Sequence, residues 1–138
     1  MRLALLMLIG LLAACGRGEE IVVQDAWIRE APPGTRIQAG YLTLTNSADT
    51  EVVLERVTSK SFERIELHEM RMRDGQMQMR KLERLAVPAK ESVRLEPGGL
   101  HLMLIKPTKP LPAGKKVTLE LYFGARILSV KAEVRKKD

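Results

Sequence analysis

The chain has 138 residues, a formal net charge of +6 and hydrophobic residues at 45% of its positions, which is enough for one domain with an apolar core. It contains a single cysteine, so an internal disulfide and thiol–disulfide chemistry within one chain are excluded. The positive charge is spread along the chain instead of gathering on one element, which argues against a nucleic-acid partner. The densest basic cluster, Arg135–Lys137, is either a solvated tail or a contact for anionic lipid head groups or an acidic partner.

The beginning of the chain has the features of an export signal. Arg2 gives a positive start, residues 3–12 are almost wholly apolar, and small residues stand directly before Cys15. The apolar run of about ten residues is too short to cross a bilayer as a helix. We therefore predict a signal peptide over residues 1–14, lipidation of Cys15 and a polar tether over residues 15–20. The protein would then be exported and lipid-anchored on the periplasmic, extracytoplasmic side of a bacterial membrane; the alternative is a plain secretory signal that leaves the cysteine as a free thiol.

The rest of the chain alternates polar and apolar side chains with a period of two, which indicates β-strands. Pro, Gly, Asn and Asp separate the apolar segments, and Asp74-Gly75 is a strong signal for a two-residue hairpin turn. No segment has the apolar spacing of an amphipathic helix. Eight or nine short strands predict one all-β domain, an antiparallel β-sandwich, over residues 21–138. The expected strands are Ile21–Val23 with Ala26–Arg29, Gly40–Asn46, Val52–Ser59, Ile65–Met72, Gln76–Leu82, Glu91–Leu95, His101–Lys106, Val117–Phe123 and Ile127–Val134.

Methionine and histidine are concentrated in one part of this domain. Five methionines and both histidines lie between residues 68 and 103, whereas methionine used as core filler is scattered. A two-residue turn at Asp74-Gly75 would place Met72 opposite Met77. Because side chains two residues apart in a strand share a face, one face of the hairpin would carry His68, Met70, Met72, Met77 and Met79.

The second part of this pattern is the segment that begins at His101. In a strand, His101 and Met103 point to one side, about 6.6 Å apart between Cα atoms, and the neighbouring leucines point to the core. Two imidazoles with several thioethers form a soft ligand set that favours copper(I) over zinc, calcium or magnesium. No cysteine lies among them, which argues against a blue-copper electron carrier. The structural alternative is that the histidines are ordinary strand residues and the methionines serve packing or an oligomer contact.

The spacing of four of these residues resembles a known family. Ten residues separate His68 from Met79, twenty-one separate Met79 from His101, and one separates His101 from Met103. This spacing is similar to the signature of the periplasmic copper(I) chaperones of the PCuAC type, which serve cytochrome c oxidase assembly. Other segments of the chain are also similar to this family, namely Pro97–Leu104, Asp25–Arg29 with Pro32–Gly34, and Ala39–Leu42. The resemblance covers about residues 21–134.

The resemblance implies a cupredoxin-like, Greek-key β-sandwich that binds one copper(I) ion. It implies that the ion passes to a protein partner, either the cytochrome c oxidase copper site or another copper-handling protein, and that the chaperone is a monomer. It carries the ligand role onto His68, Met79, His101 and Met103. Three further methionines, Met70, Met72 and Met77, are outside the family pattern. We expect them to shield the ion or to pass it to a partner. The alternative is that they form a hydrophobic docking surface.

An enzyme is the least supported class of protein. The sequence has no nucleophile–base pair, no Gly-rich phosphate loop and no carboxylate pair with a plausible partner. Two other functions remain open beside copper delivery. One is a copper-buffering or resistance protein with the same site, and the other is a lipoprotein that binds no metal and contacts another protein through its methionine-rich face.

Overall fold

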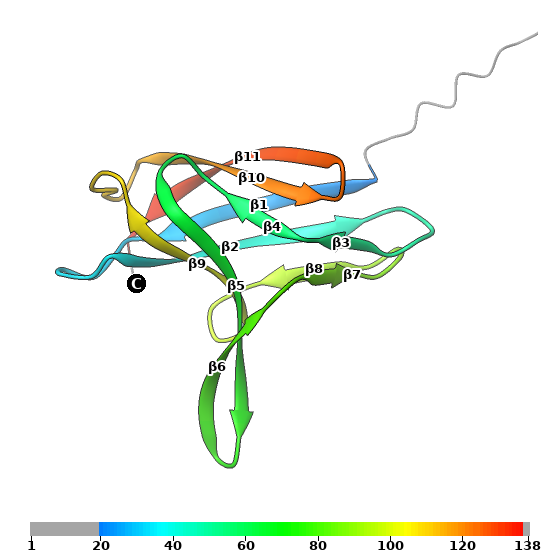
Figure 1. The fold of residues 1–138 in the computed structure, drawn as a ribbon, viewed down its shortest axis with the longest axis horizontal. Helices are drawn as coiled ribbons and strands as arrows, with labels where there is room; N and C mark the ends of the chain where they lie inside the picture. The colour runs from blue at the N-terminus through cyan, green and yellow to red at the C-terminus, as the bar shows by residue number, and fades with distance from the viewer. Residues whose placement is uncertain (1–19, 137–138) are drawn as a thin grey trace, which may run out of the picture.

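The computed structural model of the protein describes residues 20–136, and the part of the chain that it describes is all-β, without a helix (Figure 1). The predicted all-β class is confirmed. None of the described segments is a helix that could cross a membrane. The signal peptide, Cys15 and the last two residues lie outside the described residues. The strands are β1 (Ile21–Arg29), β2 (Ile37–Asn46), β3 (Val52–Leu54), β4 (Arg56–Thr58), β5 (Phe62–Arg73), β6 (Gln76–Leu82), β7 (Leu85–Val87), β8 (Ser92–Leu95), β9 (Leu100–Pro107), β10 (Lys116–Phe123) and β11 (Arg126–Arg135).

The strands form one large sheet and one small one. The large sheet has the order β4-β10-β11-β1-β2-β9-β5-β6, and β8 pairs with β2 beside β9. The strands β3 and β7 form the two-stranded sheet. The pairs are antiparallel except for β1 with β11, which run parallel in the interior of the large sheet. This order places β9 and β5 side by side, so segments that are more than thirty residues apart in sequence meet at His68 and His101.

The core consists of aliphatic side chains that alternate along the strands. Leu42 and Leu44 of β2, Leu102 and Leu104 of β9, and Leu119 of β10 are almost completely buried. Each such leucine contributes about 1.5–3 kcal/mol relative to an exposed position. Because the even-numbered leucines of β9 fill this core, the odd-numbered residues of β9 must point to the opposite face.

Three predicted elements differ from the observed ones. The segment expected as one strand from Val52 to Ser59 is two short strands, because the chain changes partner at Glu55: β3 pairs with β7 and β4 pairs with β10. The strand β7 was not predicted, since three residues are too few to show a period of two. The two parts expected for the first strand form one strand with an irregularity between Gln24 and Trp27, where Asp25 has a φ of 53°.

The hairpin of β5 and β6 projects from the body of the domain (Figure 1). Its turn residues Asp74 and Gly75 both have positive φ, 50° and 76°, as a two-residue turn of this kind requires. The predicted register is confirmed, because Met72 pairs with Met77 and Met70 pairs with Met79. Nearly all of β6 is exposed, so the outer half of the hairpin contributes little to the core.

We expect Gly40→Ala to destabilise the apo protein. A Cβ at Gly40 would lie 2.8 Å from Leu104 Cδ1 and 3.4 Å from Leu102 Cβ, and overpacking of a close-packed core costs about 1–3 kcal/mol. The end of the Leu104 side chain can shift, so a loss near about 1 kcal/mol in the free energy of unfolding is expected, measured by urea denaturation. The matched control is Gly99→Ala, whose added Cβ would meet only Glu96 O at 3.7 Å. Equal effects of the two substitutions would contradict the tight packing of β2 on β9.

Candidate metal centre

The two histidines lie directly opposite each other on neighbouring strands. His68 of β5 pairs with His101 of β9, and their rings are stacked with centroids 5.8 Å apart and an interplanar angle of 28°. Both side chains are buried, although they lie on the face that is opposite to the leucine core. The sheet order therefore brings two imidazoles into contact.

The two methionines of the predicted ligand set flank the histidine pair on the same face. Met103 lies opposite Glu66, which is two residues before His68 in β5. Met79 lies opposite Met70, which is two residues after His68. Because residues two apart share a face and diagonal cross-strand neighbours are about 7–8 Å apart, the two thioethers approach the imidazoles from adjacent strands.

A small pocket joins three of these four residues. Met79, His101 and Met103 line a concavity of about 200 Å³. The fourth residue, His68, lies beside the pocket, because its ring is stacked on the ring of His101. The structure thus brings His68, Met79, His101 and Met103 together in one place.

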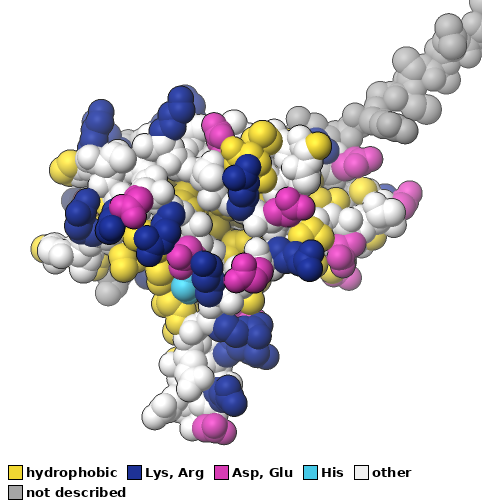
Figure 2. All heavy atoms as spheres, viewed as in Figure 1, with side chains coloured by type: hydrophobic (Ala, Val, Ile, Leu, Met, Phe, Trp, Pro, Cys, Tyr) yellow, Lys and Arg dark blue, Asp and Glu magenta, His cyan; other side chains and the backbone are white. Residues whose placement is uncertain are grey.

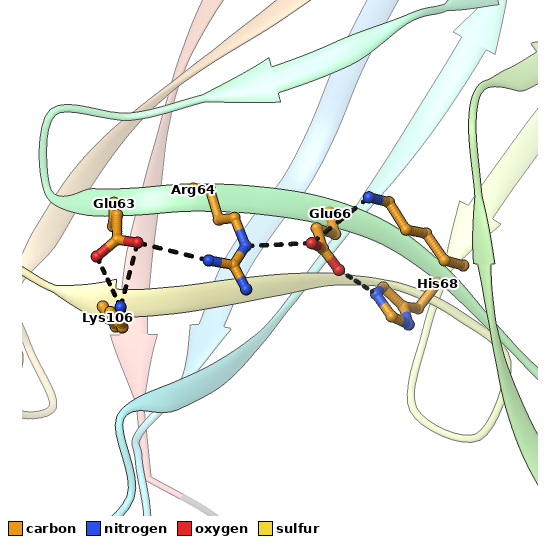
Figure 3. Close-up of polar contacts among 6 residues, drawn as sticks. Glu63, Arg64, Glu66, His68 and Lys106 are labelled. Atoms are coloured by element: carbon orange, nitrogen blue, oxygen red, sulfur yellow. Dashed lines mark hydrogen bonds and ion pairs between the residues drawn. The ribbon is translucent and has the colours of Figure 1, made fainter.

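A carboxylate orients His68. His68 Nε2 is 2.9 Å from Glu66 Oε2, and Glu66 also contacts Arg64 at 3.2 Å and Lys81 at 3.5 Å. Figure 3 shows His68 at the end of a row of charged side chains that runs along β5 to Glu63 and Lys106. The row fixes Glu66, and Glu66 in turn fixes the plane of the His68 ring.

The charge of Glu66 determines which nitrogen of His68 is free. The hydrogen bond from His68 holds the pKa of the Glu66 carboxyl below its ordinary value; partial burial opposes this effect, and Arg64 and Lys81 reinforce it. A carboxylate only accepts hydrogen bonds, so His68 Nε2–H is the donor. In the neutral imidazole the lone pair is then on Nδ1, which is buried and has no hydrogen-bond partner among the described residues. A buried, unpartnered nitrogen of this kind is a fitting ligand for a metal ion.

The tautomer of His101 is fixed by the backbone. His101 Nδ1 lies 3.1 Å from Gly99 O, and a carbonyl oxygen can only accept, so Nδ1–H donates. The lone pair of the neutral ring is therefore on Nε2. Each histidine has one nitrogen occupied by an oxygen acceptor and one nitrogen left for a ligand bond, which is the usual arrangement of metal-binding histidines.

The start of β2 and the end of β1 cover the pocket. Its remaining lining comes from Arg29, Glu30, Pro32, Ile37, Gln38 and Ala39. Arg29 is held over the rings of Trp27 and Tyr41, with its Cζ atom 5.9 and 5.5 Å from the ring centroids. Residues of β1, β2, β6 and β9 thus line the same pocket.

The donor set of this site is soft. Within residues 20–136 no group of three or more His, Cys, Asp or Glu side chains is arranged to hold a metal ion, so the two imidazoles here would need the thioethers to complete a coordination sphere. Thioether and imidazole ligands together suit copper(I) better than hard cations. The site could hold such an ion and release it by exchange of one ligand at a time.

The structure places the other predicted residues elsewhere. Met72 and Met77 lie further along the hairpin, Met70 faces Met79 but does not line the pocket, and Cys15 lies outside the described residues. Glu66 and Arg29 were not predicted from the sequence. Glu66 could have been found, because it is two residues before His68 and so shares its face; nothing in the sequence placed Arg29 at the pocket.

A family model and a curated relative match this sequence. A family model described as "Putative lipoprotein LpqE-like" matches residues 21–134. A putative lipoprotein of Leifsonia xyli subsp. xyli is 28% identical over 109 residues, which cover 78% of this chain and 64% of that protein. The chain thus spans less than two thirds of the length of this curated relative.

Two kinds of solved structure are similar to this chain. The copper-bound PCuAC domain from PmoF2 has a TM-score of 0.73 at 24% identity, over 86% of this chain and 94% of that one. The solution structure of the copper(I) form of DR1885 from Deinococcus radiodurans has a TM-score of 0.68 at 29% identity, over 91% of this chain and 84% of that one. These likenesses confirm the cupredoxin-like β-sandwich. The family match covers most of the sequence, and the chain therefore belongs to the family of LpqE-like putative lipoproteins.

Proposed function

We propose that this protein binds one copper(I) ion through His68 Nδ1, His101 Nε2 and the sulfurs of Met79 and Met103, and passes the ion to a protein partner. The observation that carries this proposal is the stacked histidine pair with one unoccupied nitrogen on each ring, next to two thioethers. The similar domains of known structure include copper-bound forms, which supports a copper-binding chaperone role. The reaction is ligand exchange and not catalysis.

Access to the ion comes from the hairpin side. Met79 is 49% exposed, and a histidine side chain reaches the surface where the hairpin leaves the body (Figure 2). An incoming ligand can therefore displace the Met79 thioether first, while the buried imidazoles still hold the ion. A soft ion can change partners in this way without being released to water.

We further propose that delivery is directed towards the copper site of cytochrome c oxidase. A lipid on Cys15 would anchor the chain to the outer surface of the membrane, and the family to which the chain belongs is one of putative lipoproteins. The anchor would restrict delivery to partners near the membrane, as a membrane oxidase is.

Anaerobic titration of the full chain with copper(I), followed by mixing with an apo copper-site fragment of the oxidase, tests this proposal. We expect one tightly bound ion and its transfer to the fragment. Tight binding without transfer would identify a copper-buffering or resistance protein. No binding would leave a lipoprotein that contacts another protein through its methionine-rich face.

Glu66→Gln is expected to weaken copper(I) binding without unfolding the protein. The amide still accepts a hydrogen bond from His68 Nε2, but it removes the negative charge that makes the imidazole a better ligand. Outer-shell partners of metal ligands are typically worth about 10–100-fold in affinity; because a neutral hydrogen bond remains, we expect about tenfold. Competition with a chromophoric copper(I) chelator measures the change.

The matched control for this change is Glu63→Gln. Glu63 lies on the same strand and contacts Arg64 and Lys106, but it does not contact a histidine. The control removes the same charge and should leave the affinity almost unchanged. Equal losses in the two variants would mean that net charge, and not the orientation of His68, sets the affinity.

A further inference from the structure

The outer half of the β5–β6 hairpin exposes apolar side chains of one kind. Met72 is 66% exposed and Met77 is 50% exposed, and this part of the hairpin projects beyond the body of the domain (Figure 1). Methionines that serve packing are covered by other side chains. These two are not, so the core does not account for their presence.

The register places the three outer methionines in a compact group. Met72 pairs with Met77, and Met70 pairs with Met79 on the next position of the same face. Directly opposed side chains have Cβ atoms about 4.5–5.5 Å apart, and pairs on the same face follow each other at about 6.6 Å along the strand. The flexible thioethers of Met70, Met72 and Met77 can therefore reach one common point.

Met79 connects this group to the candidate metal centre. It lines the pocket of about 200 Å³ together with His101 and Met103, and it also lines a second concavity of about 450 Å³ on the hairpin together with Met72. The sulfurs of the hairpin thus form a continuous series from the turn to the histidine pair.

The charges on the hairpin indicate how strongly such a group would bind a cation. Figure 2 shows Lys and Arg side chains gathered along one side of the hairpin, and the second concavity is also lined by Arg71, Arg73 and Arg80. Glu69 is paired with two of these arginines, at 3.8 Å to Arg71 and 3.1 Å to Arg80. In the hairpin register these arginines lie on the face opposite to Met70, Met72 and Met77. Uncharged thioethers with positive charge on the other face of the same hairpin would hold a monovalent ion weakly, which suits transit and not storage.

We propose that Met70, Met72 and Met77 form a second, weaker copper(I) site, through which the ion enters or leaves the centre by way of Met79. The inference rests on the proposed function, because the series of sulfurs ends at the histidine pair. Thioethers bind copper(I) without losing a proton and discriminate against hard cations. Each transfer step breaks one Cu–S bond as another forms, and the oxidation state of the ion does not change.

The test follows the methionine ε-methyl groups by NMR in the full chain, labelled with ¹³C at these methyls and titrated anaerobically with copper(I). We expect the Met79 and Met103 signals to shift with the first equivalent. The signals of Met72 and Met77 should shift only with the second equivalent, and the signal of Met70, which faces Met79, should shift with both. The matched variant replaces these three residues by leucine, which keeps the exposed apolar surface and removes the sulfurs. It should retain the first equivalent and lose the second.

The possible outcomes separate this inference from the proposed function. Outer methyl signals that stay unmoved while Met79 and Met103 shift would overturn the second site and leave the first intact. Outer signals that shift while Met79 and Met103 do not would support the thioether site and contradict the proposed centre. A leucine variant that still binds two ions would overturn the inference. So would a second equivalent that binds only as two copies of the chain associate, because the site would then lie between chains.

Discussion

The double variant His68→Gln/His101→Asn is expected to lose copper(I) binding while keeping its fold. Glutamine is chosen at position 68 and asparagine at position 101 because their amide N–H groups stand where the donating ring nitrogens stood, Nε2 beside Glu66 Oε2 and Nδ1 beside Gly99 O. The substitution removes the two nitrogens that face the proposed ion. The Met79 and Met103 thioethers alone should not hold copper(I) against a competing chelator, since a two-coordinate thioether site has no charge and no strong donor.

The fold of this variant is checked on the apo protein. Thermal unfolding of the apo form should change little, whereas copper(I) should raise the unfolding temperature of the wild type only, because a ligand stabilises the state that binds it. Stabilisation of the double variant by copper(I) equal to that of the wild type would contradict histidine ligation. Each single variant should show an intermediate affinity if the two imidazoles bind the same ion.

Replacement of Met103 by leucine is expected to separate ligation from packing. Met103 is half-buried beside Ala39 and Glu66, and a swap between methionine and leucine of similar volume usually costs less than about 1.5 kcal/mol. Loss of the sulfur removes a direct ligand, so copper(I) affinity should fall by more than the ~10–100-fold typical of an outer-shell change. Chelator competition and urea unfolding measure the two effects independently.

Met72→Leu is the matched control for this substitution. It makes the same chemical change at an exposed position of the hairpin, outside the proposed centre. The affinity for the first copper(I) ion should be that of the wild type. If Met103→Leu lowered stability strongly and left affinity unchanged, Met103 would be a packing residue and not a ligand.

The sequence predicted the parts of the structure that depend on local patterns. The turn at Asp74-Gly75 set the hairpin register, because positive φ at both positions restricts the turn type. The alternation along β9 correctly placed Leu102 in the core and His101 on the other face. The break in the segment after Val52 was missed, since a change of pairing partner depends on where distant strands lie and leaves little trace in residue periodicity.

The geometry of the site could be predicted only in part. The face shared by His68 and the hairpin methionines follows from the period of two. The direct pairing of His68 with His101 does not, because it depends on the register of two strands that are distant in sequence. The same holds for Arg29, which reaches the pocket through the packing of β1 and β2. Non-local register is set by the whole core and not by the residues that meet in it.

X-ray absorption spectroscopy of the protein loaded with one equivalent of copper(I) tests the central claim most directly. The edge reports the oxidation state, and the fine structure distinguishes nitrogen from sulfur neighbours and counts them. We predict two nitrogen and two sulfur neighbours around one copper(I) ion, from His68, His101, Met79 and Met103. A spectrum with only nitrogen and oxygen neighbours, or with sulfur and no imidazole, would contradict the proposed centre.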